Sequence, residues 1–311
     1  AVTEDVLVHL ARGLHDRVNA DRSAADRIDR LCLAGGVALN CVANEAVLRR
    51  TPFREVFVQP AANDAGTALG AAVLVWCEVL GNTRRPRMDH AFLGPEFGPD
   101  EMADALRAAG LGYETPADPF AEIVSVLGEG GIVAWFDGAL ELGPRALGHR
   151  SILADPTRFD TRTRLNLRVK QRESFRPFAP SLLAEEAAFY FDLEDAGWPA
   201  EFMLRAVPVR DAVRAQLIPA VVQHCLSTNA ANSRIHVVRQ AVNPRYHALL
   251  CAWKAAIGRG ILLNTSFNIS EPIVCTPKDA VATFARSGMD LLALGPFLVR
   301  RRDVVKGAAG R

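Results

Sequence analysis

The segment Asp137–Ser181, DGALELGPRALGHRSILADPTRFDTRTRLNLRVKQRESFRPFAPS, decides how the rest of this sequence is interpreted. Between Arg145 and Arg176 it carries eight arginines and one lysine against three acidic residues, whereas the whole chain is balanced, with 36 basic and 35 acidic residues. Arginine offers a planar fork of donors that matches phosphate. The local excess therefore indicates a polyanionic ligand, and the alternative is an ordinary solvated basic face.

The setting of these cations favours the ligand. Glycines and prolines interrupt the run, and glycine allows the backbone to approach a ligand closely. Four apolar residues are threaded through the segment, which predicts that it is anchored in a core. They are Ile152, Leu153, Phe175 and Phe178.

Composition limits the class of protein. A chain of 311 residues, half of them hydrophobic, is long enough for two domains. The net charge of +1 argues against general binding to nucleic acid or a membrane surface, and no run approaches the ~20 apolar residues of a membrane span. The amphipathic N-terminus lacks the basic region of a secretory signal. Six scattered cysteines without a CxxC pair indicate reduced thiols in a cytoplasmic protein.

The first 80 residues alternate helices and strands. Gly35 and Gly36 follow a short apolar strand, and a strand, a glycine pair and a helix start can form an anion-binding corner. Asp64 lies at the next turn from strand to helix, where an aspartate is commonly a helix cap. The expected helices are 6–18, 37–50 and 67–80, and the expected strands are 31–34 and 55–58.

Residues 81–98 have no periodicity and are expected to connect two domains. Apolar spacing beyond them predicts further helices at 100–109, 120–127, 185–191, 246–257 and 277–287. Strands are expected at 132–136, 202–207, 218–222, 261–263, 291–294 and 297–299, and residues 307–311 are expected to form a frayed tail.

Several spaced motifs resemble one family, the NodU/CmcH-type O-carbamoyltransferases, over roughly residues 6–300. Their number and order make the signal far more specific than any single motif. The motifs are LCLAGGVALN (31–40), NDAGTALGAA (63–72), LGPRALGHRSILADP (142–156), NLRVKQRESFRPFAPS (166–181), LLNTSFN (262–268) and EPIVCTP (271–277).

This resemblance implies an α/β protein of two domains. Residues 1–95 would be the second half of an actin-like (ASKHA, RNase H-like) domain, and residues 96–305 a YrdC-like domain with a twisted sheet. It also implies an O-carbamoyltransferase that forms carbamoyl-adenylate from carbamoyl phosphate and ATP. The carbamoyl group would then pass to a hydroxyl of a small molecule, such as a sugar or an antibiotic scaffold.

The resemblance also assigns roles to residues. Lys170-x-Arg172 and Ser266-x-Asn268 are similar to the KxR and SxN pair with which YrdC-like domains bind ATP and its Mg²⁺. The implied catalytic residues are Arg145, Arg150, Lys170 and Arg176. Nucleotide contacts are implied for Arg172, Ser266, Asn268, Gly35, Gly36, Asn40, His224 and Arg234, and Asp64 matches a ligand of Fe²⁺ or a similar metal in the complete transfer site.

Two departures leave alternatives open. The chain has no HxxxH, the metal pair that the family carries in the first half of its actin-like domain. Either a separate polypeptide supplies that half, or this chain is a fragment or remnant. The family's H-x-D-G-x-x-R stretch is longer here, from His224 to Arg234, and lacks the aspartate. A non-catalytic nucleotide-binding subunit is the competing hypothesis, and neutral charge disfavours a threonylcarbamoyl-adenylate synthase acting for tRNA.

Overall fold

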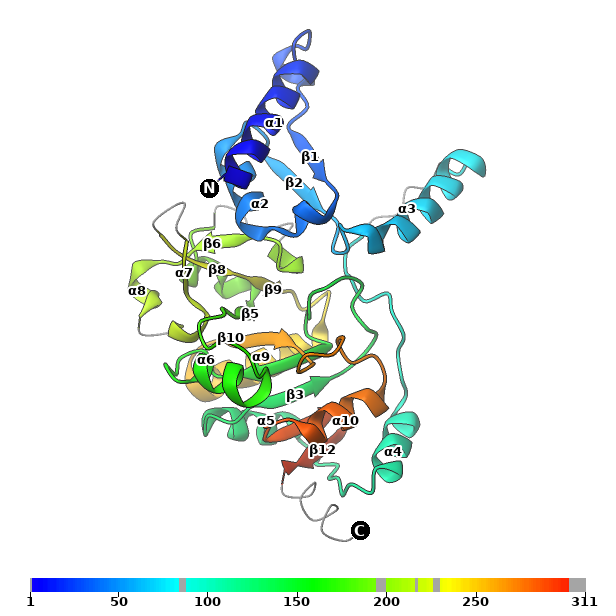
Figure 1. Ribbon diagram of the computed structural model, residues 1–311, viewed down its shortest axis with the longest axis vertical. Helices are drawn as coiled ribbons and strands as arrows, with labels where there is room; N and C mark the ends of the chain where they lie inside the picture. The colour runs from blue at the N-terminus through cyan, green and yellow to red at the C-terminus, as the bar shows by residue number, and fades with distance from the viewer. Residues whose placement is uncertain (1, 84–87, 194–199, 216–217, 226–229, 302–311) are drawn as a thin grey trace.

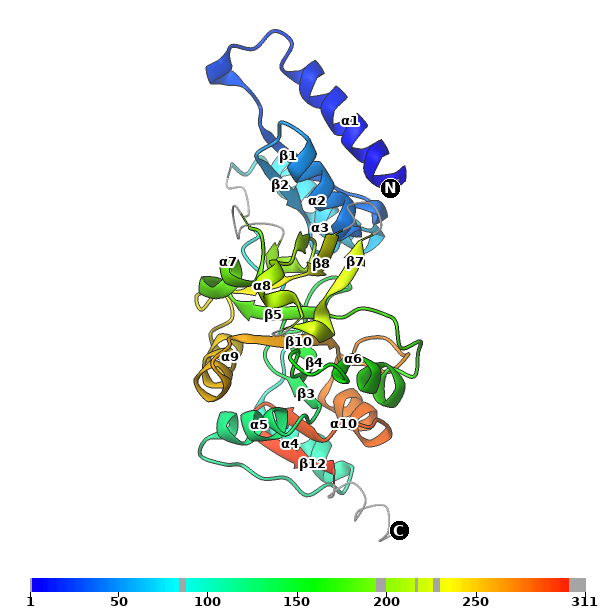
Figure 2. The same ribbon diagram turned by 90° about the vertical axis from the view of Figure 1, so that its left-hand side faces the viewer.

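The computed structural model describes residues 2–83, 88–193, 200–215, 218–225 and 230–301. The expected tail at 307–311 and the end of the second expected domain lie outside these residues. An N-terminal part lies at one end of the long axis, and a large sheet with its helices lies at the other, as Figures 1 and 2 show. The described residues contain no helix that is long and apolar enough to cross a membrane.

The N-terminal part is a small α/β unit. Its strands β1 (Arg30–Leu33) and β2 (Glu55–Val58) are parallel, with Leu31 opposite Val56. Helices α1 (Val2–Val18) and α2 (Cys41–Arg50) pack beside them, and Val8, Leu31, Val47 and Val56 share one core. Because the strands run parallel, the loops after both strands meet at one edge of this unit.

Helix α3 (Thr67–Leu74) continues as a π-helical turn, η4 (Val75–Val79). The expected helix at 67–80 is therefore confirmed, with a wider final turn in which the Leu80 N–H donates to the Val75 carbonyl over 2.9 Å. The helix projects sideways from the rest of the molecule in Figure 1, and none of its side chains is buried.

The C-terminal part is built on a mixed sheet of seven strands, in the order β12-β11-β3-β4-β10-β5-β9. The expected α/β class is confirmed, and so are the strands at 132–136, 261–263, 291–294 and 297–299. The strands are β3 (Val133–Phe136), β4 (Arg150–Ala154), β5 (Ala179–Leu183), β9 (His236–Val238), β10 (Ile261–Ser266), β11 (Leu291–Leu294) and β12 (Phe297–Arg300).

Helices cover both faces of this sheet, as Figure 2 shows. Alternation along β3 sends Ala134 and Phe136 into one core, and Val133 and Trp135 into the other. The first core is covered by α4 (Pro99–Ala108) and α10 (Pro277–Arg286), and the second by α5 (Pro119–Gly128) and α9 (Pro244–Ile257).

The segment 137–181 runs through the middle of this sheet. Its strand β4 pairs with both β3 and β10. Ile152, Leu153 and Phe178 are buried as predicted, whereas Phe175 is 75% exposed. The prediction of an anchored segment is therefore confirmed at three of the four apolar positions. Its middle forms α6 (Thr161–Arg164) and a π-helical turn, η5 (Leu165–Val169).

Some predicted elements were wrong. The run 218–222 is a 3-10 helix, η8 (Pro219–Val221), and not a strand; its apolar residues are buried by tertiary packing, which a short apolar run cannot reveal. Two other predictions were closer. The run 202–207 begins within the 3-10 turn η7 (Ala200–Phe202) and is a strand only at residues 206 and 207. The predicted helix at 185–191 is confirmed as helical, as η6 (Ala184–Glu186) followed by α7 (Ala187–Tyr190). A small second sheet pairs β6 (Ala206–Pro208), β8 (Ala230–Arg234) and β7 (Gln223–Cys225).

Candidate functional site

Lys170 is held by the end of β10. It follows the π-helical turn η5, is 4% exposed, and points its ammonium nitrogen at Ser266 and Asn268. Nζ lies 2.6 Å from the Ser266 main-chain oxygen, 2.7 Å from Asn268 Oδ1 and 2.9 Å from the Asn268 main-chain oxygen. The fold therefore brings together the KxR and SxN segments, which are nearly 100 residues apart in the chain.

Burial, together with the nearby Arg172, lowers the pKa of Lys170 to about 7. Its amine is thus close to its titration midpoint at neutral pH. The oxygens around Nζ favour the protonated form, because only an ammonium donates three hydrogen bonds. Lys170 can therefore change its charge in response to an anion at this site.

Arg172 is positioned by two neighbours. Its Nε donates to Asn166 Oδ1 over 2.7 Å, and its guanidinium lies over the ring of Phe178, 5.0 Å from the centroid. Burial lowers the pKa of Arg172, and repulsion from Arg176 and Arg234 lowers it further. Asn166 also donates to the main-chain oxygens of Ser174 and Arg176 and so fixes the 171–176 loop. Its role was missed, because nothing in the sequence distinguishes it from a surface asparagine.

Arg145 and Arg234 form the next part of the cationic site. Burial and the charge of Arg234 lower the pKa of Arg145 to about 10. The Nε atoms of both arginines are buried, and within the described part of the chain neither has a hydrogen-bond partner. Two like charges with unsatisfied donors are costly unless an anion is present. Lys170, Arg172, Arg234 and Arg145 can therefore bind a polyanion together.

This cationic site reaches the N-terminal part. Arg145 Nη2 donates to the Leu39 main-chain oxygen over 3.2 Å. Cys41, the first residue of α2, lies beside Arg145 and Arg234; burial raises the pKa of its thiol, although both arginines oppose this. Gly143 has a φ of +107°, and a Cβ there would lie 2.6 Å from the Pro60 main-chain oxygen. The arginine-bearing loop thus packs against the loop that follows β2.

The glycine corner is exposed at the edge of the N-terminal part. Gly35 has a φ of +98°, and its N–H donates to Ala62 over 2.7 Å, which ties it to the loop before Asp64. Gly36 begins the 3-10 turn η2 (Gly36–Leu39). Asn40 caps α2, because its side chain accepts from Val42 and Ala43. Asp64 is exposed in the 3-10 turn η3 (Asp64–Gly66), on the same edge as Gly35.

Arg150 has a different environment. It is fully buried, its Nη1 donates to the Asp137 main-chain oxygen over 2.5 Å and to Gly138 over 3.0 Å, and it stacks over Phe136. Its donors are directed at main-chain oxygens, so its geometry is that of a positioning residue. Glu141 Oε1 completes this arrangement by accepting from the N–H groups of Leu147, His149 and Arg150.

Arg176 lies at the margin of the cationic site, whereas Arg234 belongs to it. Arg176 pairs with Glu173 at 2.8 Å, and both side chains are half exposed. His224 is in β7, opposite Ala231 of β8, but its side chain lies outside the described residues. Arg234 ends β8 opposite Ala206 of β6.

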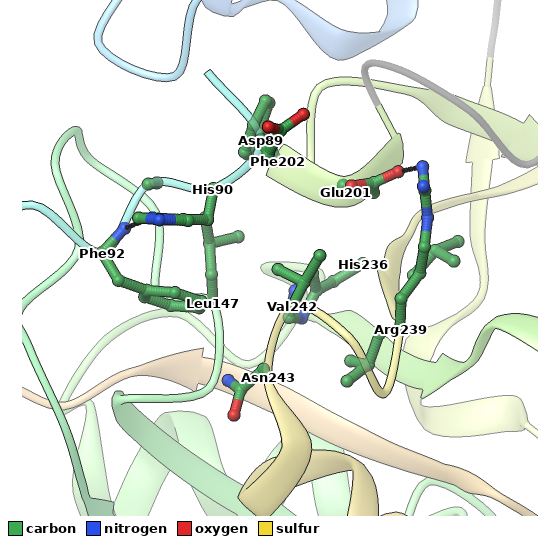
Figure 3. Close-up of a pocket in the computed structure, with 13 residues that line it drawn as sticks. Asp89, His90, Phe92, Leu147, Glu201, Phe202, His236, Arg239, Val242 and Asn243 are labelled. Atoms are coloured by element: carbon green, nitrogen blue, oxygen red, sulfur yellow. Dashed lines mark hydrogen bonds and ion pairs between the residues drawn. The ribbon is translucent and has the colours of Figure 1, made fainter. Parts of the chain in front are cut away.

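A small pocket lies near the junction of the two parts (Figure 3). Its walls are residues 89–92, Leu147, the η7 turn and the connection from β9 to α9. His236, at its base, shares a 2.7 Å hydrogen bond with Ser181, and burial lowers the pKa of His236 to about 3. Arg239 and Glu201 form an ion pair at its rim. None of the candidate site residues lines this pocket.

Comparison with known proteins shows that the chain belongs to the carbamoyltransferase family. Residues 1–73 match the family described as Carbamoyltransferase N-terminus, and residues 124–301 match Carbamoyltransferase C-terminus. The resemblance inferred from the sequence motifs is therefore confirmed.

Three relatives illustrate the similarity. An uncharacterized protein of Synechocystis, sll1178, is 41% identical over 96% of this chain and 51% of its own length. The nodulation protein NolO of Bradyrhizobium diazoefficiens is 41% identical over 89% of this chain and 50% of its own length. The 3'-hydroxymethylcephem-O-carbamoyltransferase of Amycolatopsis lactamdurans is 34% identical over 88% of this chain and 49% of its own length. The chain spans about half the length of these curated relatives.

Among solved structures, a full-length HypF in a phosphate- and nucleotide-bound form aligns with 63% of this chain and 22% of its own. The TM-score is 0.42 and the sequence identity is 18%.

Proposed function

We propose that this chain forms carbamoyl-adenylate from carbamoyl phosphate and ATP, as part of an O-carbamoyltransferase. The observation that carries the proposal is the contact of Lys170 with Ser266 and Asn268, beside Arg172 and in line with two half-buried arginines, Arg145 and Arg234, whose Nε atoms are buried and unsatisfied. The proposed domains are those expected above, an actin-like portion over residues 1–95 and a YrdC-like domain over residues 96–305.

The chemistry requires several negative charges to come together. Water would cleave carbamoyl phosphate to carbamate and inorganic phosphate. A carbamate oxygen would then attack the α-phosphorus of ATP, a new O–P bond would form as the bond between the α- and β-phosphates breaks, and pyrophosphate would leave. Lys170 and Arg172, with Ser266 and Asn268, would hold the ATP phosphates, whose negative charge Mg²⁺ also offsets. Arg145 and Arg234 would hold the second anion. Positioning and fixed cations supply most of the catalysis in such transfers.

Transfer to an acceptor is assigned to the N-terminal part. A hydroxyl of a sugar or natural product would attack the carbamoyl carbon, and AMP would leave, at the edge that carries Gly35, Gly36, Asn40 and Asp64. The described residues do not fit a complete Fe²⁺ site there, since the group of three potential ligands found among them does not include Asp64. One carboxylate cannot hold a catalytic metal, and no step is assigned to iron in this chain.

The second candidate function is a nucleotide-binding subunit that needs a partner polypeptide. Its support is the exposed apolar surface of the N-terminal part. Val6, Leu10 and Leu14 of α1 follow one another at helical spacing and are 46–60% exposed, and α3 buries no side chain. Such surfaces mark interaction sites, and a polypeptide that supplies the HxxxH half of the actin-like domain would cover them.

The test is to incubate the chain with ATP, carbamoyl phosphate and a panel of hydroxylated acceptors. Pyrophosphate release without a carbamoylated acceptor supports adenylate formation by this chain and transfer by a larger assembly. Acceptor carbamoylation by the chain alone shows that no further half is needed. The absence of pyrophosphate release from folded protein contradicts the first proposal and favours the second.

A further inference from the structure

A cysteine, a histidine and a glutamate meet on the face of the sheet opposite the turn that carries Lys170. His247 and Cys251 are four residues apart on α9, so they lie on the same side of the helix. Glu185 belongs to the η6 turn, directly after β5, against which α9 packs. The chain thus brings three metal-binding side chains together from two separate elements, away from the arginine-rich site.

The distances among these side chains suit a metal ion. The Cys251 sulfur lies 3.6 Å from His247 Nδ1, and a Glu185 oxygen lies 3.3 Å from the other ring nitrogen, Nε2, so this carboxylate must rotate to reach an ion at Nδ1. One donor atom from each residue lies within 4.8 Å of the other two. A tetrahedral zinc ion with bonds of about 2.3 Å to sulfur and about 2.1 Å to nitrogen separates those two atoms by about 3.6 Å. The observed sulfur–nitrogen spacing matches this value.

Burial and charge support the same assignment. His247 is 8% exposed, which keeps its ring in place, whereas the Glu185 and Cys251 side chains are exposed and can adjust. The Glu185 side chain is 54% exposed, so it can rotate toward the ring nitrogen that faces the sulfur. Glu186 is already paired with Lys254 at 2.7 Å, which leaves Glu185 as the carboxylate nearest the imidazole.

We infer that Cys251, His247 and Glu185 bind a divalent cation of the zinc class, with water in the fourth position. Thiolate and imidazole are the ligands that zinc prefers, and three protein ligands of mixed type leave one position open. Binding would release the thiol proton and connect the middle of α9 to the end of β5. Because the ion would bind the folded chain and not the unfolded one, it would stabilise this half of the protein.

The experiment is titration of the purified, metal-free chain with Zn²⁺ and, separately, with Co²⁺, whose absorption reports a bond to thiolate. We expect one equivalent of Zn²⁺, a thiolate-to-cobalt charge-transfer band, and a higher unfolding temperature with Zn²⁺. Cys251→Ser and His247→Gln should abolish all three effects, and Glu185→Gln should weaken affinity by about tenfold or more.

Matched controls are Cys32→Ser, an exposed thiol on β1, and His9→Gln, an exposed histidine on α1; both should bind as the unaltered chain does. Absence of stoichiometric uptake, or uptake unchanged by Cys251→Ser, overturns the inference. The readouts do not involve ATP or carbamoyl phosphate, so the outcome is independent of the proposed function.

Discussion

The guanidinium of Arg145 donates a hydrogen bond to the main-chain oxygen of Leu39, and this contact links the arginine-rich loop to the N-terminal part of the chain. Arg145 also lies close enough to Arg234 for their charges to repel, which lowers the pKa of Arg145. The charge of Arg234 lowers the pKa of Arg172 in the same way. A series of cations therefore extends from Lys170 to the start of α2. Through the Arg145–Leu39 contact, this series of cations connects an anion-binding site at Lys170 with the turn beside Gly35, on the edge that also carries Asp64.

Replacing Arg145 tests the role of this series. We expect Arg145→Ala to reduce carbamoyl-phosphate-dependent ATP–pyrophosphate exchange by at least about tenfold, because it removes a charged donor from the anion site. Loss of one charge-assisted hydrogen bond costs about 1.5–3 kcal/mol in binding, and more if the contact tightens in the transition state. Arg158→Ala, at an exposed arginine of the same segment, is the matched control and should exchange normally. Normal exchange in folded Arg145→Ala would show that this residue is dispensable.

Lys170 gives the reaction a pH dependence. Its pKa of about 7 means that the charged form predominates below pH 7 and is lost as the pH rises. If the charge binds substrate, kcat/KM for exchange should fall above pH 7, approaching tenfold per pH unit. Lys170→Arg keeps a permanent charge and should flatten this decline, whereas Lys170→Met should lower activity at every pH. An identical profile for Lys170→Arg and the unaltered chain would argue against Lys170 as the titrating group.

A buried ion pair holds the two parts together. Glu45 of α2 accepts from Arg205 over 2.8 Å, and both side chains are at most 7% exposed. Breaking such a pair on one side costs roughly 3–5 kcal/mol, since the buried guanidinium of Arg205 loses a charged partner. We expect Glu45→Gln to lower the free energy of unfolding by about that amount in urea. Glu55→Gln removes an exposed pair with Arg30 and should change stability by less than about 1 kcal/mol.

Metal analysis separates Asp64 from the α9 cluster. We expect the purified chain to bind Fe²⁺ weakly or not at all at Asp64, because a single exposed carboxylate is a poor ligand set. Asp64→Asn should therefore leave the metal content unchanged, whereas Cys251→Ser should remove bound Zn²⁺. Tight, stoichiometric iron that disappears in Asp64→Asn would reveal further ligands near this edge.

Prediction from the sequence succeeded where a local pattern is sufficient. Apolar spacing gave the helix at 120–127, which extends over Pro119–Gly128, and the strand at 55–58 to the residue. It failed at 218–222, where buried apolar residues belong to a 3-10 turn. It also passed over β4 and β5, because these strands lie within a segment whose charges and prolines conceal the buried core.

The sequence by itself determined the family and the cationic residues that could bind an anion, since motifs and residue types are local properties. Only the tertiary structure decided what each arginine does. The same side chain becomes a positioning residue at Arg150, where main-chain oxygens surround it, and remains near the surface at Arg176. It becomes a half-buried group whose Nε is buried and unsatisfied at Arg145 and Arg234. The physical reason is that desolvation and hydrogen-bond partners depend on which distant segments the strand order brings together, and a linear pattern does not specify that order.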